Sequence, residues 1–364
     1  MKVSQVIETL EDFAPLALQE SFDNSGVQVG DISQEVKGIL LCLDVTEEVL
    51  EEALKMDLNL IISHHPLLFG PIKKLTGRTY IERCVAKACK NDLVIYSAHT
   101  NADNALGGLN FYLAEKLGLQ NFRILSPQKD GLLKLVTFVP DAQAETVRNA
   151  LFGAGAGCIG NYDSCSFNVS GAGTFRPGEQ TLPFVGNRFE LHTEPEIRIE
   201  TILPIHKKSA VLRALLASHP YEEPAYDFYP LVNDYATAGS GVIGELPSPE
   251  REEVFLQRMK TDFKCRCIKH SPFTGKLIRK VALCGGSGAF LIPDAIACGA
   301  DVFITGEAKY NDYYNVENKM LLAVVGHYES EIFIKDLFYD VIKKKITNFA
   351  VHFSTTNANP VNYL

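Results

Sequence analysis

The chain has 364 residues, of which 46% are hydrophobic, 22% are charged and 10% are aromatic. One hydrophobic core rarely serves so long a chain, so two or three domains are expected, and the composition excludes a disordered chain. The formal net charge of −9 at pH 7 argues against a long-range attraction for nucleic acid or anionic lipid.

The first 15 residues predict an amphipathic helix. Apolar residues recur there at helical spacing with acidic residues between them: Val3, Val6, Ile7, Leu10 and Phe13. This pattern differs from the continuous apolar run of a signal peptide, and no later segment reaches the ~20 apolar residues that span a bilayer. The nine cysteines form no Cys-x-x-Cys pair, which indicates a reducing compartment. We therefore expect a cytoplasmic protein.

Residues 38–100 alternate between apolar runs and helical patterns. The run that begins at Gly38 predicts a strand, and Thr46 then stands as the N-cap of a helix whose first turn holds two glutamates. A second apolar run precedes His64, and a third lies at 93–100 after another helical stretch. The alternation predicts an α/β domain with a largely parallel sheet covered on both faces. An active site is then expected at the carboxyl ends of the strands.

The pattern changes beyond about residue 126. Predicted strands and helices follow in the approximate order β-α-β…β-α-β, interrupted by a segment rich in glycine, serine and asparagine up to Gly178. The strands are expected at 134–140, 198–205 and 225–231, and the helices at 142–152 and 209–217. We therefore predict an inserted α+β domain of ferredoxin-like fold at 131–232.

After the insert, the pattern of the first segment returns. The expected order is a strand ending at Leu283, a glycine loop at 285–288, a helix through Ala297, a strand at 301–305, a further apolar strand, and a final helix starting near Ser330. We predict that 1–130 and 233–364 form two similar α/β halves of one domain.

Three clusters of side chains that bind metals follow predicted strands: His64 with His65, His99 with Asp103, and His327 with Glu331. Rings buried within a strand would need hydrogen bonds or a metal, whereas rings at the carboxyl edge of a sheet can reach one cleft. His327 and Glu331 are one helical turn apart, so both can face the same ions. Imidazoles and carboxylates together suit Zn, Fe or Mn, and an Asp oxygen can bridge two ions. We expect all three clusters at one sheet edge, where they form a two-metal site.

Structural roles are the alternatives for these residues. Asp103 can cap the glycine-rich stretch at 107–108, and Glu331 can cap the start of the helix near it. His99 fits a hydrogen-bond partner that orients the site better than a direct ligand. The glycines 285, 286 and 288 suit either anion binding or a tight turn, and they lack the Gly-Lys-Thr/Ser ending of a P-loop.

Six segments occur in the order of one family: SFDNSGVQVG, ISHHPLLF, SAHTNADNALGGLN, CGGSG, ITGEAKYND and VVGHYESE. Through them the chain resembles the GTP cyclohydrolase 1 type 2 homologues, the NIF-three-like dinuclear metal proteins. The resemblance covers about 1–125 and 235–364, and the insert resembles the PII-like or CutA-like domain of longer bacterial members. It implies a toroidal homohexamer with two divalent metal ions per chain, held by these ligands: His64, His65, Asp103, His327 and Glu331.

The chain departs from the family pattern at three positions, and none of them is a metal ligand. Glu307 stands where an Asp is expected, Asn311 lies near the place of an expected His, and Phe22 replaces a commoner Trp. These departures leave the metal ligands intact and put a role of the loop at 304–312 in substrate binding or proton transfer in question.

Together these features predict a metal-dependent hydrolase for a small, nucleotide-like substrate, with water as the nucleophile and Glu331 as the catalytic carboxylate. The alternative is a non-catalytic, metal-binding hexamer whose insert senses a small ligand and regulates a partner. In the insert, four residues carry ligand-type groups that suit trimer packing, a small ligand or another metal ion: His219, Tyr221, Glu222 and Glu223. DNA binding is disfavoured by the acidic net charge, and no membrane partner is expected.

Overall fold

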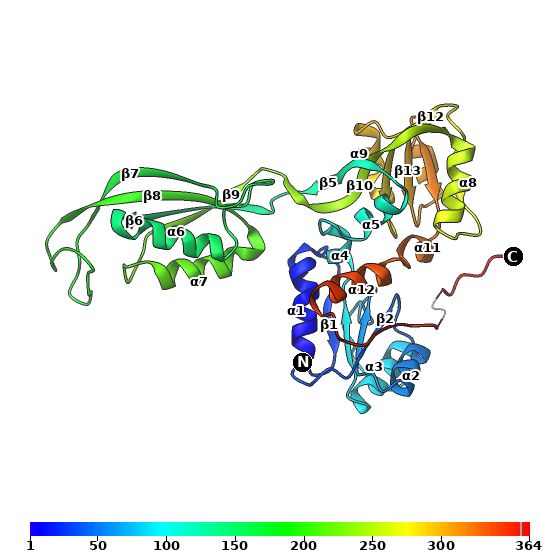
Figure 1. The fold of residues 1–364 in the computed structure, drawn as a ribbon, viewed down its shortest axis with the longest axis horizontal. Helices are drawn as coiled ribbons and strands as arrows, with labels where there is room; N and C mark the ends of the chain where they lie inside the picture. Colours follow the sequence, from blue (N-terminus) through cyan, green and yellow to red (C-terminus); the bar gives the residue numbers. More distant parts are fainter. Residues whose placement is uncertain (357–358) are drawn as a thin grey trace. The chain divides into compact units, whose positions relative to one another are not determined.

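A computed structural model describes residues 1–356 and 359–364 of the chain (Figure 1). The chain divides into unit 1, which holds residues 1–126 and 238–364, and unit 2, which holds residues 127–237. The insert expected at 131–232 falls inside unit 2. Among the described residues, no helix combines the length and the apolar character needed to cross a membrane.

The apolar runs after Gly38 form the first sheet of unit 1, in the order β1-β4-β3-β2-β15. Strands β15, β2, β3 and β4 pair in parallel, and β1 pairs with β4 in antiparallel orientation. Helices α2 and α3 pack on this sheet, and Thr46 caps α2 as predicted by accepting a hydrogen bond from the Val49 N–H. The bounds are α1 (Val3–Phe13), β1 (Gly26–Val29), β2 (Ile39–Cys42), α2 (Glu47–Lys55), β3 (Leu60–Ser63), α3 (Tyr80–Lys90), β4 (Val94–Ser97) and β15 (Val351–Phe353).

The second sheet of unit 1 has the order β11-β14-β13-β12-β10-β5. Its inner strands β12, β13 and β14 are parallel, and they end in the glycine loop, at the 306–311 loop and at Val325, respectively. The elements of this half are β5 (Gln120–Gln128), β10 (Tyr235–Arg251), α8 (Glu252–Asp262), β11 (Lys269–His270), β12 (Leu277–Cys284), α9 (Ile292–Ala297), β13 (Val302–Thr305), α10 (Asp312–Asn315) and β14 (Leu321–Val324). Four further helices belong to unit 1: α4 (Thr100–Asn104), α5 (Leu109–Lys116), α11 (His327–Glu331) and α12 (Ile334–Lys345).

Unit 2 follows the order β6-α6-β7-β8-α7-β9 and forms an antiparallel sheet with strand order β7-β8-β6-β9. Helices α6 and α7 lie on one face of this sheet, where alternate residues of β6 and β8 pack against them (Figure 1). The bounds are β6 (Leu132–Pro140), α6 (Ala144–Gly153), β7 (Ser166–Phe175), β8 (His192–Pro204), α7 (Lys208–Ser218) and β9 (Tyr226–Leu231).

Two elements differ from the sequence predictions. The segment rich in glycine, serine and asparagine contains the ten-residue strand β7, whose residues have weak strand propensity and are mostly exposed. Its register is set by continuous pairing with β8 rather than by its own pattern. The predicted start of the last helix near Ser330 was wrong, because a short helix already begins at His327 after Gly326, and α12 follows it.

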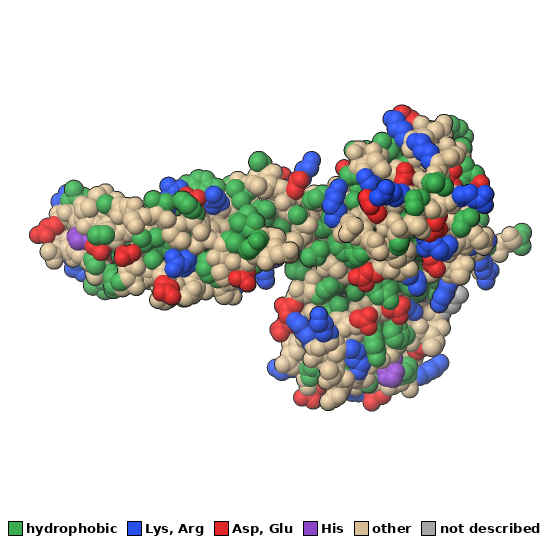
Figure 2. All heavy atoms as spheres, turned by 45° about the horizontal axis from the view of Figure 1, so that its top comes forward, with side chains coloured by type: hydrophobic (Ala, Val, Ile, Leu, Met, Phe, Trp, Pro, Cys, Tyr) green, Lys and Arg blue, Asp and Glu red, His purple; other side chains and the backbone are tan. Residues whose placement is uncertain are grey.

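The surface carries charges of both signs. Figure 2 shows Lys and Arg side chains interspersed with Asp and Glu side chains over the face that it draws. This distribution agrees with the small excess of acidic residues in the sequence, and on this face it offers no extended basic surface for a polyanion.

Candidate metal site

The three predicted clusters meet in unit 1, at the carboxyl ends of strands from two sheets. β3 leads into His64 and His65, β4 leads into the segment that holds His99 and Asp103, and β14 of the second sheet leads into α11. The expectation of one sheet edge was therefore wrong. The apolar runs of the two halves look alike, so the sequence pattern did not show that their strands pair in separate sheets.

The first group of donor atoms surrounds the side chain of His64, which is fully buried. Its Nε2 atom lies 3.7 Å from Oδ1 of Asp103 and 3.8 Å from Oε1 of Glu331. Both His64 Nε2 and Asp103 Oδ1 are buried without a hydrogen-bond partner among the described residues. Leaving two such polar atoms unsatisfied is costly, and a divalent cation between them would satisfy both. The residues present therefore fit a metal ion.

The second group joins His65, His327 and the other oxygen of Glu331. Oε2 of Glu331 lies 2.9 Å from Nε2 of His65 and 3.0 Å from Nε2 of His327. The two imidazole nitrogens are 3.3 Å apart, close to the separation of about 3.3 Å that two ligands about 2 Å from one tetrahedral ion adopt. Glu331 thus directs one carboxylate oxygen to each group.

His99 also reaches this site. Its ring nitrogen belongs to a group with His64 and His65 in which the ligand atoms all lie within 4.8 Å of one another, so these three residues can also hold a metal ion. The opposite ring nitrogen, Nδ1, lies 2.8 Å from Oδ1 of Asp23. Asp23 therefore orients His99, whose Nε2 is left as a further donor beside the two rings.

Three acceptors behind the rings fix their orientation. Nδ1 of His64 lies 2.9 Å from the carbonyl oxygen of Ala98, Nδ1 of His65 lies 2.7 Å from Oδ1 of Asp44, and Nδ1 of His327 lies 3.2 Å from Oε1 of Glu307. Such contacts set which nitrogen of a ring faces a metal. Glu307, one of the departures from the family pattern, thus contacts a predicted ligand, whereas Asn311 is exposed and outside the cavity.

The sequence interpretation assigned no role to Asp44 or Asp23. Asp44 lies two residues beyond the end of β2, so the same strand-end signal that selected His64 was available for it. Asp23 lies in a loop and is brought to His99 across 76 positions of the sequence, which no local pattern indicates.

The titratable groups of the site shift one another's pKa. Burial lowers the pKa of His65, but its hydrogen bonds to Asp44 and Glu331 outweigh burial and raise the pKa to about 10. Burial opposes ionisation of Glu331, yet the imidazoles of His327 and His65 hold its pKa well below the usual value. Burial raises the pKa of Asp103 to about 7. Negative charge at Glu331 and positive charge around it are therefore coupled.

The structural alternatives find no support in these contacts. The carboxylate of Glu331 faces the imidazoles rather than the backbone N–H groups of a helix start, and Oδ1 of Asp103 accepts no hydrogen bond from a glycine turn or from any other described residue. The glycine loop is a tight turn, because its N–H groups are already used: Gly285 donates to Asn110, Gly286 to Ser330 and Gly288 to Thr305. The sequence left anion binding and a tight turn as two interpretations of this loop, and these hydrogen bonds argue against anion binding.

A cavity of about 520 Å³ opens beside the donor groups. His65, His99, Asp103, His327 and Glu331 line it together with three aromatic residues: Phe22, Phe69 and Phe290. These phenyl rings are more than half exposed, and those of Phe22 and Phe69 lie 6.5 Å apart. The cavity is therefore lined by both metal-binding side chains and aromatic rings, and small-molecule sites commonly combine polar and aromatic residues in this way.

The sequence matches known proteins over nearly its whole length. A model of the Duf34/NIF3 (NGG1p interacting factor 3) family matches residues 1–360. A protein of Halalkalibacterium halodurans named GTP cyclohydrolase 1 type 2 homolog is 39% identical over 368 residues, covering 99% of this chain and 98% of its own length. A Bacillus subtilis protein of the same name is 34% identical over 369 residues, with the same coverage.

Solved structures agree with this similarity. A Bacillus cereus protein related to NIF3 superposes with a TM-score of 0.86 at 36% identity, covering 100% of this chain and 99% of that chain. The Staphylococcus aureus protein SA1388 superposes with a TM-score of 0.79 at 29% identity over the same shares. The mixed α/β architecture with several sheets is thus shared by both.

Proposed function

Since the chain belongs to the Duf34/NIF3 family, we propose that it is a dinuclear metal-dependent hydrolase that acts on a small, nucleotide-like substrate. The observation that carries the proposal is the position of Glu331. Its two carboxylate oxygens face two separate groups of donors, one at His64 and Asp103 and one at His65 and His327.

Two divalent ions held by these five residues would act as Lewis acids and make water nucleophilic at neutral pH. The residues around them have separate tasks. Asp44 and Glu307 orient His65 and His327, and Asp23 orients His99. We assign Glu331 the role of catalytic carboxylate, because it lines the cavity and its two oxygens face both groups of donors.

The walls of the cavity support a planar substrate. Phe22, Phe69 and Phe290 line the cavity with exposed side chains, and nucleobases of any identity can stack on aromatic rings. The names of the relatives point to GTP as the first compound to test.

The experiment begins with metal content. Purified chain is expected to hold about two transition-metal ions, and Glu331→Gln should lose them without unfolding. Glu329→Gln is the matched control, because Glu329 lies on the same short helix but accepts a hydrogen bond from Tyr363 instead of facing the site. Turnover of GTP, other nucleotides and phosphate esters should then disappear in Glu331→Gln and persist in Glu329→Gln. Unchanged metal content in the Glu331 variant would refute the proposed ligand set.

The proposal includes an assembly and a role for unit 2. We propose a homohexamer in which unit 2 is a PII-like module, supported by its β-α-β-β-α-β order and antiparallel four-stranded sheet. Light scattering on the purified chain tests the hexamer. Full metal occupancy with no turnover of any compound in the panel would favour the alternative, a non-catalytic assembly regulated through unit 2.

A further inference from the structure

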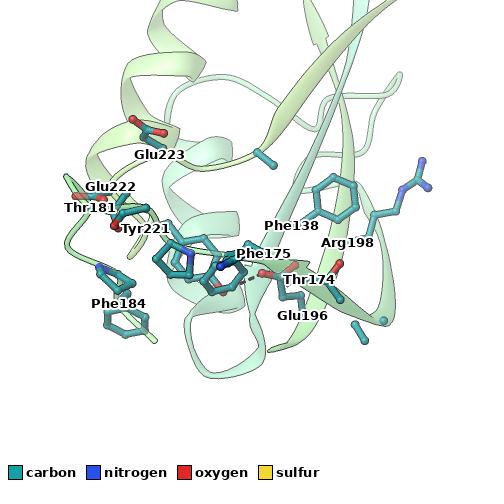
Figure 3. Close-up of a pocket in the computed structure, with 18 of the residues that line it drawn as sticks. Phe138, Thr174, Phe175, Thr181, Phe184, Glu196, Arg198, Tyr221, Glu222 and Glu223 are labelled. Carbon is teal, nitrogen blue, oxygen red and sulfur yellow. Dashed lines mark hydrogen bonds between the residues drawn. The ribbon is translucent and has the colours of Figure 1, made fainter. Parts of the chain in front are cut away.

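Unit 2 contains a cavity of about 600 Å³ that the proposed hydrolase reaction does not use. It lies over the sheet face opposite to α6 and α7. Val139 and Ile199 pack against these helices, so their neighbours Phe138 and Arg198 point to the other face, and both line the cavity. Strand β7 and two loops, 176–191 and 219–225, contribute the remaining walls (Figure 3).

Aromatic rings form one side of this cavity. Figure 3 shows Phe175, Phe184 and Tyr221 grouped around the same space. The ring centroid of Tyr221 lies 5.8 Å from that of Phe175 and 6.3 Å from that of Phe184, and both pairs are tilted rather than stacked. Several aromatic rings that line one volume attract a cation that lies over a ring face.

A buried carboxylate lies beside these rings. Glu196 is only 7% exposed, although it lies on the sheet face that no helix covers. Its Oε1 atom accepts a hydrogen bond of 2.8 Å from the hydroxyl of Tyr221, and Oε2 has no hydrogen-bond partner among the described residues. Gly173 leaves the room for this carboxylate, since a Cβ atom there would collide with Oε2. A carboxylate held this way lacks a positive partner of its own.

Two positive side chains line the cavity, and one of them already has an anionic partner. Arg198 forms an ion pair of 2.8 Å with Glu200, and Nε of Arg176 donates to the carbonyl of Phe189. Two further carboxylates, Glu222 and Glu223, line the cavity, and Glu222 accepts a hydrogen bond from the Leu182 N–H. Three carboxylates therefore line the cavity together with one guanidinium, that of Arg176, that has no anionic partner among the described residues, so the uncompensated charge is negative.

We propose that this cavity binds a small organic cation, an ammonium-type nitrogen on an apolar or aromatic body. The charged nitrogen lies against Glu196 and the rings of Phe175, Phe184 and Tyr221, and the body lies along Phe138 and Pro177. The volume of about 600 Å³ is in the range of small-ligand sites.

The test measures binding to the full-length chain by saturation-transfer NMR. The probe is benzyltrimethylammonium, and 2,2-dimethyl-3-phenylpropan-1-ol is a neutral compound of nearly the same shape. The cation is expected to bind at least about ten-fold more tightly than the neutral compound, which corresponds to about 1.4 kcal/mol. Phenylacetate, an aromatic anion, is expected to bind no better than the neutral compound.

Variants assign the binding to this cavity. Glu196→Gln keeps the acceptor for Tyr221 but removes the charge, and it should weaken binding of the cation about ten-fold. Phe184→Ala should weaken it as well, and its ring is half exposed, so the fold tolerates the change. Glu194→Gln is the matched control, because Glu194 lies on the same strand, pairs with His192 and does not line the cavity. Its affinity should equal that of the unchanged chain.

Binding of the cation to this cavity should not depend on the metal site. Glu331→Gln should therefore leave the affinity for the probe unchanged. Three outcomes would overturn the inference: no binding of the cation by the unchanged chain, equal binding of the neutral compound or of the anion, or full affinity in both Glu196→Gln and Phe184→Ala.

Discussion

Oδ1 of Asp44 lies 2.7 Å from Nδ1 of His65, so the Nε2 atom of that ring is the one that faces Glu331 and His327. Among the described residues, Asp44 forms no hydrogen bond or ion pair with the other proposed ligands, yet it sets the orientation and basicity of His65. The affinity of the site for metal therefore depends on Asp44, which is not itself one of the proposed ligands.

The first prediction concerns this contact. Asp44→Asn should lower the affinity for metal roughly 10–100-fold, because the amide orients the ring less firmly and makes it less basic. Competition with a chromogenic chelator measures the change. Asp57→Asn serves as the control, since Asp57 is a surface carboxylate that pairs with Lys37. Equal affinities of the two variants would mean that Asp44 does not orient a ligand.

The second prediction concerns pH. Burial raises the pKa of Asp103 to about 7, so in chain stripped of metal by a chelator this carboxyl is largely protonated below that pH. Metal binding must then release this proton together with the proton of His65, whose pKa is about 10, so affinity should rise as the pH increases from about 6 to about 8. Calorimetric titrations in two buffers of different ionisation enthalpy report the protons released. An affinity independent of pH in this range would contradict the role of Asp103.

The third prediction uses the glycine loop. Gly286 has a φ of +60°, and a Cβ atom there would collide with Oε1 of Glu331. Gly286→Ala should therefore displace the carboxylate and abolish metal binding at the group around His64. Gly118→Ala is the control, since Gly118 has a φ of +70° with open space around it, and both variants should lose about 1 kcal/mol of stability through backbone strain. If Gly286→Ala retained its metal, the loop would not shape the site.

The fourth prediction concerns Glu52 and the residues after β15. Burial opposes ionisation of Glu52, but hydrogen bonds from Ser354, Thr355 and Thr356 together outweigh it and lower the pKa from 4.5 to about 2. A depressed pKa of an acid stabilises the fold above the unfolded-state pKa, and this contribution is lost as the pH falls towards about 2. Glu52→Gln should therefore lower the free energy of unfolding by about 1–2 kcal/mol at pH 7 and by less in acid.

Urea denaturation at several pH values measures this difference, and hydrogen exchange at 353–356 locates it. Glu51→Gln is the control on the same helix, because Glu51 forms only an exposed ion pair with Lys87, and such pairs contribute about 0–1 kcal/mol. A constant difference between Glu52→Gln and the unchanged chain from neutral to acid pH would show that ionisation of Glu52 is not the cause.

Local patterns predicted much of the candidate site. His64, His99 and His327 each follow a continuous apolar run, and such runs are reliable signals of buried strands whose ends reach a sheet edge. The pattern did not show that β14 belongs to another sheet than β3 and β4, because strand pairing depends on contacts between distant segments. Asp23 was missed for the same reason, whereas Asp44 followed a strand end and was overlooked.

Local patterns predicted the helices better than the long strands. Thr46 and the helix after it were identified from the cap and the acidic first turn. Strand β10 was not, since its later part contains Pro247 and Pro249 and its register with β12 shifts between Glu245 and Glu250. Irregular pairing of this kind arises from the neighbouring strand and leaves no periodic signal in the sequence.

The order of the donor residues along the chain has a consequence for biosynthesis. Asp103 and Glu331 are 228 positions apart (331 minus 103), and the whole of unit 2 is made between them. At about 5–20 residues per second, the ribosome exposes the first three donors roughly 10–45 s before the last one emerges. A nascent chain therefore presents His64, His65 and Asp103 without the two ligands from α11. Any product that terminates before α11 keeps this incomplete ligand set. Metal loading is then a late step, completed when the C-terminal segment closes over a site whose first donors were synthesised long before.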